Sequence, residues 1–460
     1  MITASSRLAA IDLPMWPRPE VAPTLPAAIY PARLERLRAK AELHGYDQIV
    51  VYADREHSAN LAYLTGFDPR FEEAILIAGA TGRPVLLAGN ECIGLARQAA
   101  LPVDAVLHQD LSLPSQPRDR SEPLLDVLAD AGLRRDGRIG IVGWKVPRDR
   151  SSLECPAWLV DAVRDIVGGQ GMVENATDLL IDAADGLRVI NEAHQLAAFE
   201  HASCETSSGV RDLLFGVRPG MREREAVQLL RWSGAPLSCH LMLTAGPRAR
   251  FGLLSPGDRA IERGDPMTVA FGIWGALTCR AGFVVDGPAE LPSGVGDYVG
   301  RLVAPYFDAI AEWYGALRIG QTGGALQEII DRRLGDPFFG IFLNAGHQLH
   351  LDEWVNSPIS RDNPIELASG MVLQADIIPA TGGPYFTTNV EDGVALADER
   401  LRATLADEHP DLWNRVTTRR AFMRDALGIE LHPDVLPFSN IPAYLPPYLL
   451  RPDLAMTRAR

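Results

Sequence analysis

Two acidic residues and one histidine in the last third of the chain have the types and surroundings that proton-transfer chemistry needs. Asp376 lies within GMVLQADIIP, a run otherwise apolar enough to be buried, and Glu391 precedes the strand-like GVAL. A buried carboxylate is costly without a partner, and His347 in AGHQLHLDEW supplies a nitrogen that can pair with one. The sequence therefore predicts a histidine/carboxylate cluster suited to general acid–base catalysis.

Each of these residues also has a structural interpretation. Asp376 can be a hydrogen-bonded structural carboxylate, Glu391 can lie on a solvated strand edge, and His347 can be a loop histidine with its own partners. A cysteine nucleophile is a further alternative, because Cys279 lies in a predicted strand and Cys239 is next to a histidine, but cysteines are also among the most readily buried residues. The residues alone leave these alternatives open.

Helices and strands alternate in the first part of the chain, which predicts an α/β domain. Apolar residues at helical spacing predict a helix over 32–44. A buried strand (DQIVVYAD), a short helix (HSANLAYLTG), a hairpin (AILIAGATGRPVLLAG), a further strand (RIGIVGW) and a helix (PAWLVDAVRDIV) follow. Six prolines between Pro14 and Pro31 predict an extended arm. We expect the arm over 1–30 and the α/β domain over 31–170.

The second part of the chain must position the candidate cluster. A long helix at 191–215 and a second one in REREAVQLLRWSG precede strands in SCHLMLTAG, PMTVAFGIWGALTCRAGFVVDG and GMVLQADIIP, with helices between them. This α+β layout predicts a second domain over 171–400. For 401–460 we expect a charged helix and then an extended tail, rich in proline and aromatic residues, lying on a surface.

Length, charge and cysteine content exclude several classes of protein. The 460 residues exceed what one core usually supports, and 47% hydrophobic with 22% charged residues is typical of globular proteins. The net charge of −15 disfavours nucleic acid and anionic membranes as partners. Five cysteines without CxxC spacing, and no signal peptide or long apolar stretch, predict a cytoplasmic protein. The candidate cluster leads us to expect a small-molecule substrate as its partner.

Eight segments along the chain match the motifs of one known family in order and spacing. They are LAYLTGF, GLRVINEAHQLAAFEHAS, VRPGMREREA, LTAGPR, a GD turn before an apolar strand, AGH, GMVLQADIIP and NVEDGVAL. Over about residues 30–400 the chain thereby resembles the creatinase/aminopeptidase P/prolidase group. The resemblance implies an N-terminal creatinase-type α/β domain, an α+β C-terminal catalytic domain of the pita-bread fold, and a homodimer.

The metallopeptidases of this group hold two metal ions with two aspartates, a histidine and two glutamates. Carried over by motif, the two aspartates fall on Ala270 and Leu277, while the other three ligands fall on His347, Asp376 and Glu391. Alanine and leucine offer no oxygen that could help to bridge two ions. We therefore expect no cofactor, as in the creatinase and ectoine hydrolase members of this fold; the alternative is one Mn, Fe or Zn ion held by His347, Asp376 and Glu391.

The residues after the AGH motif are candidates for substrate contacts. The family's second histidine that touches substrate falls on Trp354 by strict count, and His350 is the closest chemical replacement. Asp352 and Glu353 lie between them. Trp354 can stack on a planar or cationic group or pack in the core, and His350 can instead be an exposed loop histidine. Arg280 matches an arginine of the family, for which a structural ion pair is favoured over a substrate contact.

The expected mechanism uses the two carboxylates as a pair. If Asp376 and Glu391 are close together, they cannot both ionise cheaply, so one stays protonated. They then divide into general acid and general base, or one of them anchors a cationic group, while His347 transfers the proton. This favours hydrolysis of a C–N bond in a small amidine, amide or cyclic amino-acid-like metabolite. The alternatives are an Xaa-Pro peptidase-like enzyme with one metal ion and a catalytically inactive binding protein.

Overall fold

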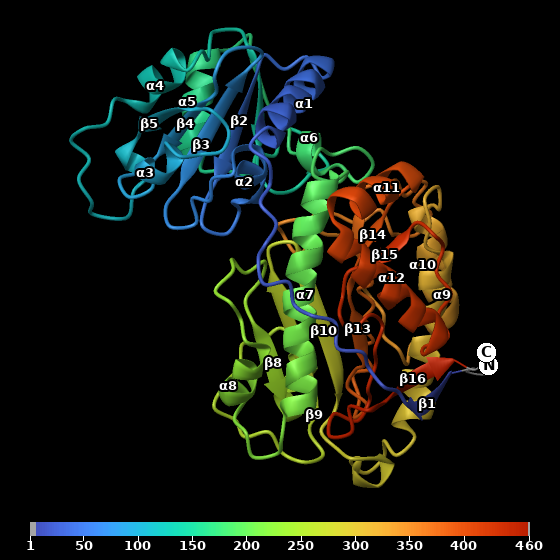
Figure 1. Cartoon of the computed structure of the whole chain (residues 1–460). Helices are drawn as coiled ribbons and strands as arrows, with labels where there is room; N and C mark the ends of the chain where they lie inside the picture. Colours follow the sequence, from blue (N-terminus) through green and yellow to red (C-terminus); the bar gives the residue numbers. More distant parts are fainter. Residues whose placement is uncertain (1–5, 459–460) are drawn as a thin grey trace. The chain divides into compact units, whose positions relative to one another are not determined.

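The computed structural model describes residues 6–458 (Figure 1). The chain divides into two compact units: one is Leu25–Val189, and the other comprises the residues up to Thr24 and from Ile190 onward. None of the helices in the described part combines the length and the apolar character that crossing a membrane requires.

The unit Leu25–Val189 is built on one six-stranded sheet in the order β5-β4-β3-β2-β6-β7. β2 runs parallel to β6, β6 to β7 and β4 to β5, whereas β3 is antiparallel to both of its neighbours. The strands are β2 (Gln48–Ala53), β3 (Ala74–Gly79), β4 (Val85–Ala88), β5 (Asp104–Leu107), β6 (Arg138–Val142) and β7 (Met172–Asn175). The helices are α1 (Ile29–Leu43), α2 (Ala59–Thr65), α3 (Ile93–Ala96), α4 (Leu124–Asp130), α5 (Ala157–Val167) and α6 (Asp178–Ile181), with a 3-10 turn at Gln109–Leu111. The predicted α/β domain is confirmed.

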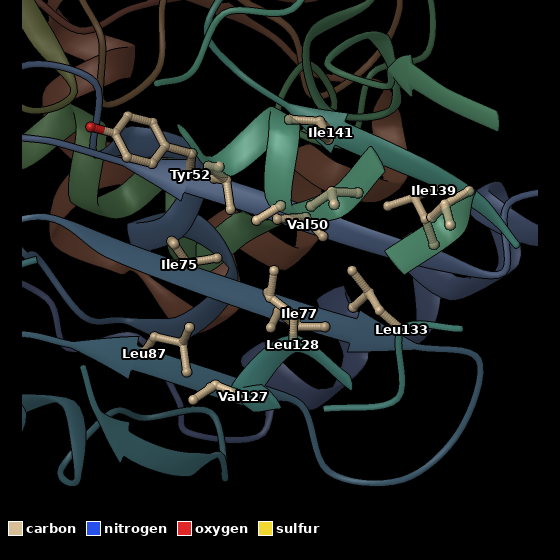
Figure 2. Close-up of a cluster of buried hydrophobic side chains, with 14 of the residues drawn as sticks. Val50, Tyr52, Ile75, Ile77, Leu87, Val127, Leu128, Leu133, Ile139 and Ile141 are labelled. Atoms are coloured by element: carbon tan, nitrogen blue, oxygen red, sulfur yellow. The ribbon is translucent and has the colours of Figure 1, made fainter. Parts of the chain in front are cut away.

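The core of this unit lies between the sheet and the helices α4 and α5. Figure 2 shows Val50, Ile77 and Ile141 from three neighbouring strands and Leu128 from α4, which belong to one buried cluster. Every residue of β2 is buried. A strand that is covered on both faces needs an uninterrupted apolar run rather than alternation, which is why QIVVYA forms a central strand here.

Within its described residues, the other unit holds two four-stranded sheets and a two-stranded one. The larger sheets have the orders β13-β10-β9-β8 and β11-β12-β14-β15, and β1 pairs with β16. The strands are β1 (Ser6–Ala10), β8 (Met242–Ala245), β9 (Pro266–Ile273), β10 (Ala276–Phe283), β11 (His347–Gln348), β12 (Val372–Gln374), β13 (Asn389–Glu391), β14 (Gly393–Leu396), β15 (Val435–Pro437) and β16 (Leu454–Arg458). The helices are α7 (Ala193–Gly216), α8 (Glu223–Ala226), α9 (Ala304–Ala316), α10 (Gly323–Leu334), α11 (Glu399–Glu408) and α12 (Pro410–Asp425). A π-helical turn at Val299–Val303 precedes α9, and 3-10 turns lie at Val227–Leu230, Gly246–Phe251 and Pro288–Glu290.

The chain passes from one large sheet to the other at Asp392. Glu391 is the last residue of β13 in the first sheet, and Gly393 is the first residue of β14 in the second. His347 begins β11 in the second sheet, where it is opposite Gln374 of β12. The two sheets therefore each contribute to the neighbourhood of His347.

Three segments differ from the sequence-based expectations. The helix expected in REREAVQLLRWSG is short, because α8 ends at Ala226 and a 3-10 turn leads to Arg231 with a positive φ of 51°. The charged helix near the C-terminus is two helices, since Pro410 disfavours helical geometry at the preceding His409. The tail expected on a surface is instead buried over most of 435–449, because its apolar and aromatic side chains join the core.

Candidate active site

Three carboxylates surround the imidazole of His347. Its Nε2 lies 3.2 Å from a carboxylate oxygen of Glu353, 3.5 Å from one of Glu391 and 4.0 Å from one of Asp376. The side chain of His347 is fully buried, and those of Asp376 and Glu391 are 7% and 3% exposed. The structure thus brings together the three residues for which the sequence predicted proton-transfer chemistry and adds Glu353 to them.

A glycine next to His347 allows this strand to lie close to its neighbour. Gly346 has a φ of +122°, and a Cβ atom there would lie 2.6 Å from the carbonyl oxygen of Gln374. Only glycine adopts this backbone geometry without strain. The AGH motif therefore fixes the position of the imidazole.

A short loop brings the side chains of Glu353 and Trp354 into contact with His347. The loop is closed by a bridge between Gln348 and Asn356, in which the Gln348 N–H donates to the Asn356 carbonyl at 2.8 Å. The Trp354 ring stacks on the His347 ring with centroids 4.2 Å apart and an interplanar angle of 17°. Trp354 is 38% exposed. Its stacking partner in the structure is thus the histidine itself, and the indole separates His347 from solvent.

The carboxylates control the protonation of the cluster. Burial opposes the charged imidazolium, but the carboxylates of Glu353 and Glu391 outweigh it and raise the pKa of His347 to about 10. Burial, together with the charge of Glu391, raises the pKa of Asp376 well above its usual range. The site therefore favours an imidazolium on His347 and protonation of the Asp376 carboxyl group.

The two positions where the family has aspartates carry apolar side chains. Ala270 and Leu277 form one buried cluster with Met242 and Cys279, and Cys239 packs against it. Cys279 is opposite Ala270 on one side and Glu391 on the other. Burial and the nearby Glu391 raise the pKa of the Cys279 thiol well above its usual range, which disfavours the thiolate that a cysteine nucleophile needs.

The residues around His347 are compatible with one bound metal ion but not with a bridged pair of ions. The apolar cluster leaves the Ala270 and Leu277 positions without a ligand oxygen, whereas a dinuclear centre needs anionic oxygens around both ions. Single ligand atoms of His347, Glu353 and Glu391 lie within 4.8 Å of one another, close enough to bind one ion together. Glu353 takes the place in this set that the sequence analysis gave to Asp376.

Arg280 lies in a buried network with Asp392 and the C-terminal tail. Its guanidinium forms an ion pair with Asp392 at 2.8 Å, with both side chains nearly fully buried, and donates to the carbonyl of Tyr444 at 2.7 Å. Asp392 also accepts a hydrogen bond from the Ala443 N–H at 2.9 Å. Arg280 therefore fixes the buried tail against β10. Sequence reasoning expected an ion pair for Arg280 but did not identify Asp392, although it is next to Glu391.

The remaining candidates for substrate contacts lie around the same loop. His350 is fully buried rather than exposed, and its ring meets Phe199 edge-on at 5.0 Å. The His350 N–H donates to the backbone carbonyl of Asp352 at 3.1 Å. These contacts give His350 and Asp352 a part in shaping the loop that carries Glu353 and Trp354.

Comparisons with known proteins agree with this architecture. The sequence profile of the Creatinase/Prolidase N-terminal domain matches residues 33–152. No curated protein sequence matches the chain significantly. Among solved structures, the prolidase of Pyrococcus horikoshii is 16% identical, covers 80% of this chain and 95% of its own, and gives a TM-score of 0.62.

Two further solved structures are similar to the same extent. The Xaa-Pro dipeptidase of Bacillus anthracis is 16% identical over 81% of this chain and 96% of its own, with a TM-score of 0.61. The X-Pro aminopeptidase of Thermotoga maritima is 18% identical over 80% of this chain and 95% of its own, also with a TM-score of 0.61. At these identities the similarity establishes the fold. The chain thus combines a creatinase-type N-terminal α/β domain with a C-terminal domain that matches pita-bread prolidase structures, as the sequence predicted.

Proposed function

We propose that the protein is a hydrolase of the creatinase and ectoine hydrolase type, which cleaves a C–N bond in a small amidine, amide or cyclic amino-acid-like metabolite without a dinuclear metal centre. The observation that carries this proposal is the cluster of His347 with three carboxylates, beside an apolar wall where the metallopeptidases have ligands. Acid, base and positive charge are available there within a few ångströms.

In this proposal, the raised pKa values of Asp376 and His347 indicate which step each residue performs. Asp376 is the general acid, because the raised pKa leaves it a proton to donate to the departing nitrogen. Glu391 is the base that takes a proton from the attacking water. The imidazolium of His347 stabilises the negative charge that develops on the carbonyl oxygen, or on its equivalent in an amidine. Glu353 and Glu391 also favour a substrate with a cationic group.

Access to the cluster requires movement of Trp354. The indole covers His347 on the solvent side, so a substrate enters by displacing the ring and can then stack against it. A planar amidinium is suited to this stacking, because cations and planar groups bind the face of an indole.

The direct test is a turnover screen with amidines, ureas, amides and cyclic amino-acid derivatives. With a substrate in hand, we expect His347→Ala and Glu391→Gln to lower kcat by at least about 100-fold, as loss of acid–base groups generally does, with unchanged far-UV circular dichroism. Glu399→Gln on an exposed helix turn is the matched control. Wild-type rates in both site variants would overturn the assignment, and tight binding without turnover would favour an inactive binding protein.

A hydrolase with a single metal ion, acting on Xaa-Pro peptides, is the second candidate. It is supported by the ligand atoms of His347, Glu353 and Glu391, which lie within 4.8 Å of one another. An ion bound there would supply Lewis acidity to the reaction. Elemental analysis of tag-free protein, with His347→Ala as the control, distinguishes the candidates: about one ion per chain that is lost in the variant favours the metal-dependent enzyme, and hydrolysis of Xaa-Pro dipeptides would establish it.

We also propose that the enzyme is a cytoplasmic homodimer. The family resemblance supports a dimer, and five free cysteines among the described residues are compatible with a reducing compartment. Light scattering during size-exclusion chromatography tests the dimer directly, since a mass near the 50.1 kDa of one chain would contradict it.

A further inference from the structure

A second histidine/carboxylate cluster lies outside the candidate active site. It consists of His194, Glu408 and His409. His194 is the second residue of α7, Glu408 is the last residue of α11, and His409 lies at the junction with α12. α7 packs against α11 (Figure 1), so residues more than 200 positions apart in the sequence are brought together.

The spacing of the two histidines matches the geometry of a zinc site. His194 Nδ1 and His409 Nε2 are 3.2 Å apart. Zinc binds imidazole nitrogen at about 2.0–2.1 Å with tetrahedral geometry, which places two nitrogen ligands about 3.3 Å apart. The two rings are nearly perpendicular, with centroids 5.3 Å apart. In the structure the two nitrogens are hydrogen-bonded to each other, and an ion that replaces the shared proton can contact both with little movement of either ring.

Glu408 supplies the negative charge at this position. A carboxylate oxygen of Glu408 lies 3.7 Å from Nε2 of His194, the ring nitrogen that does not face His409, and one donor atom from each of the three residues fits within 4.8 Å. The Glu408 side chain is 44% exposed, which leaves room for it to turn toward an ion. Two imidazoles and a carboxylate are a donor set that zinc prefers.

The backbone around the cluster is well anchored. The His409 N–H donates to the Leu405 carbonyl at 3.0 Å, and the Trp413 N–H donates to the His409 carbonyl at 3.0 Å. His409 is therefore held between two helices, and His194 is held by the first turn of α7. Zinc binding here would require rearrangement of side chains only.

A cavity of about 930 Å³ borders the cluster, and Glu408 and His409 line it. The same cavity is lined by prolines of the N-terminal arm and by His201, which lies about two turns further along α7 than His194. Glu200 also lines it but is committed to ion pairs with Arg415 and Arg419 at 2.6 and 2.7 Å. The cavity, which Glu20 and Asp411 also line, has space for a water molecule as a fourth ligand.

We propose that His194, Glu408 and His409 form a zinc-binding site that is separate from the active site and links the start of α7 to the α11–α12 junction. Bound zinc stabilises the native state because the unfolded chain does not hold these donors together. The site is complete within one chain and does not depend on the proposed enzymatic activity.

The test is isothermal titration of the purified, metal-free full chain with Zn²⁺ alone. We expect His194→Ala and His409→Ala each to weaken this binding by at least about tenfold, since even outer-shell changes cost zinc sites 10–100-fold. His201→Ala is the matched control, because it removes a histidine from the same helix and the same cavity but lies two turns from the cluster. The set is repeated in the His347→Ala background to remove any zinc bound at the active site.

A thermal shift measurement gives a second readout with the same variants. Zn²⁺ is expected to raise the Tm of the wild type and of His201→Ala but not that of His194→Ala or Glu408→Gln. Glu408→Gln serves where a histidine variant does not fold, because it keeps the size of the side chain. Equal zinc affinity in the wild type and the three cluster variants, or no zinc binding by the wild type, would overturn the proposal.

Discussion

Cys279 and Glu391 are directly opposite each other on the antiparallel strands β10 and β13. On its other side Cys279 is opposite Ala270 of β9, so a carboxylate, a thiol and a methyl group follow one another across one face of the sheet. Leu277 lies two residues before Cys279 and points to the same face. Of the three residues in this row, only Glu391 on the edge strand β13 carries a carboxylate that could bind a metal ion.

Introducing carboxylates on this face should increase the affinity of the site for metal ions. We predict that Ala270→Asp combined with Leu277→Asp raises the affinity for Mn²⁺ at least tenfold over the wild type, because both new carboxylates would lie near Glu391 and His347. Titration calorimetry measures the affinity. The double variant with asparagine at both positions is the control, since it has the same shape without the charge, and equal Mn²⁺ affinity in the two double variants would show that these positions do not face the cluster.

Glu353 should account for part of the raised pKa of His347. We predict that Glu353→Gln lowers this pKa from about 10 toward the normal range, because it removes one of the two carboxylates that favour the imidazolium. Nitrogen NMR of labelled histidine measures the titration. Asp352→Asn, which removes the adjacent acid of the same loop, should leave the pKa of His347 within a few tenths; an equal effect of both variants would argue against a specific Glu353 contact.

The free energy of unfolding should fall as the pH rises between the pKa of His347 in the unfolded chain and its pKa in the folded protein. A histidine that titrates near 6.5 when unfolded and near 10 when folded stabilises the native state fully below about pH 6.5 and loses this contribution as the pH approaches 10. The raised pKa of Asp376 acts in the same direction. Urea unfolding between pH 6.5 and 9.5 should show a loss of a few kcal/mol in the wild type and a clearly smaller one in His347→Gln. Parallel curves for the two proteins would contradict the raised pKa.

The sequence could predict the elements of the site better than its side-chain contacts. His347, Asp376 and Glu391 were identifiable because each combines a polar group with an apolar strand in a motif of fixed order. The contact of Glu353 with His347 depends on closure of one loop through the Gln348–Asn356 bridge, which no local pattern encodes.

Long-range packing was the other part that local patterns could not decide. The tail was expected on a surface because its prolines break regular structure, but the Ile441–Tyr444 segment instead accepts hydrogen bonds from Arg280, more than 150 residues away. The same burial requires a partner for Arg280, which Asp392 provides. A pattern of residue types shows that such a segment is apolar but does not show which surface covers it.

The Arg280–Asp392 pair should be structural. We predict that Arg280→Met or Asp392→Asn lowers the free energy of unfolding by about 3–5 kcal/mol, because each leaves a buried group without its partner. Urea unfolding at neutral pH measures the change. Arg361→Met, which removes an exposed partner of Asp331, should cost less than about 1 kcal/mol. Normal stability of the Arg280 variant together with lost substrate binding would instead assign Arg280 to the substrate.

Gly346 should be required for the geometry of the site. Gly346→Ala forces a side chain into a backbone with φ of +122° and against the Gln374 carbonyl, 2.6 Å from the new Cβ, so we predict a loss of about 1–3 kcal/mol in the free energy of unfolding. Because the strain is relieved by moving β11, the His347 pKa should also fall as the imidazole separates from Glu391. Gly383→Ala is the control, since its nearest neighbour would lie at an ordinary 3.8 Å and its φ is not positive. If Gly346→Ala keeps both the stability and the His347 pKa of the wild type, the close approach of β11 to β12 does not position the imidazole.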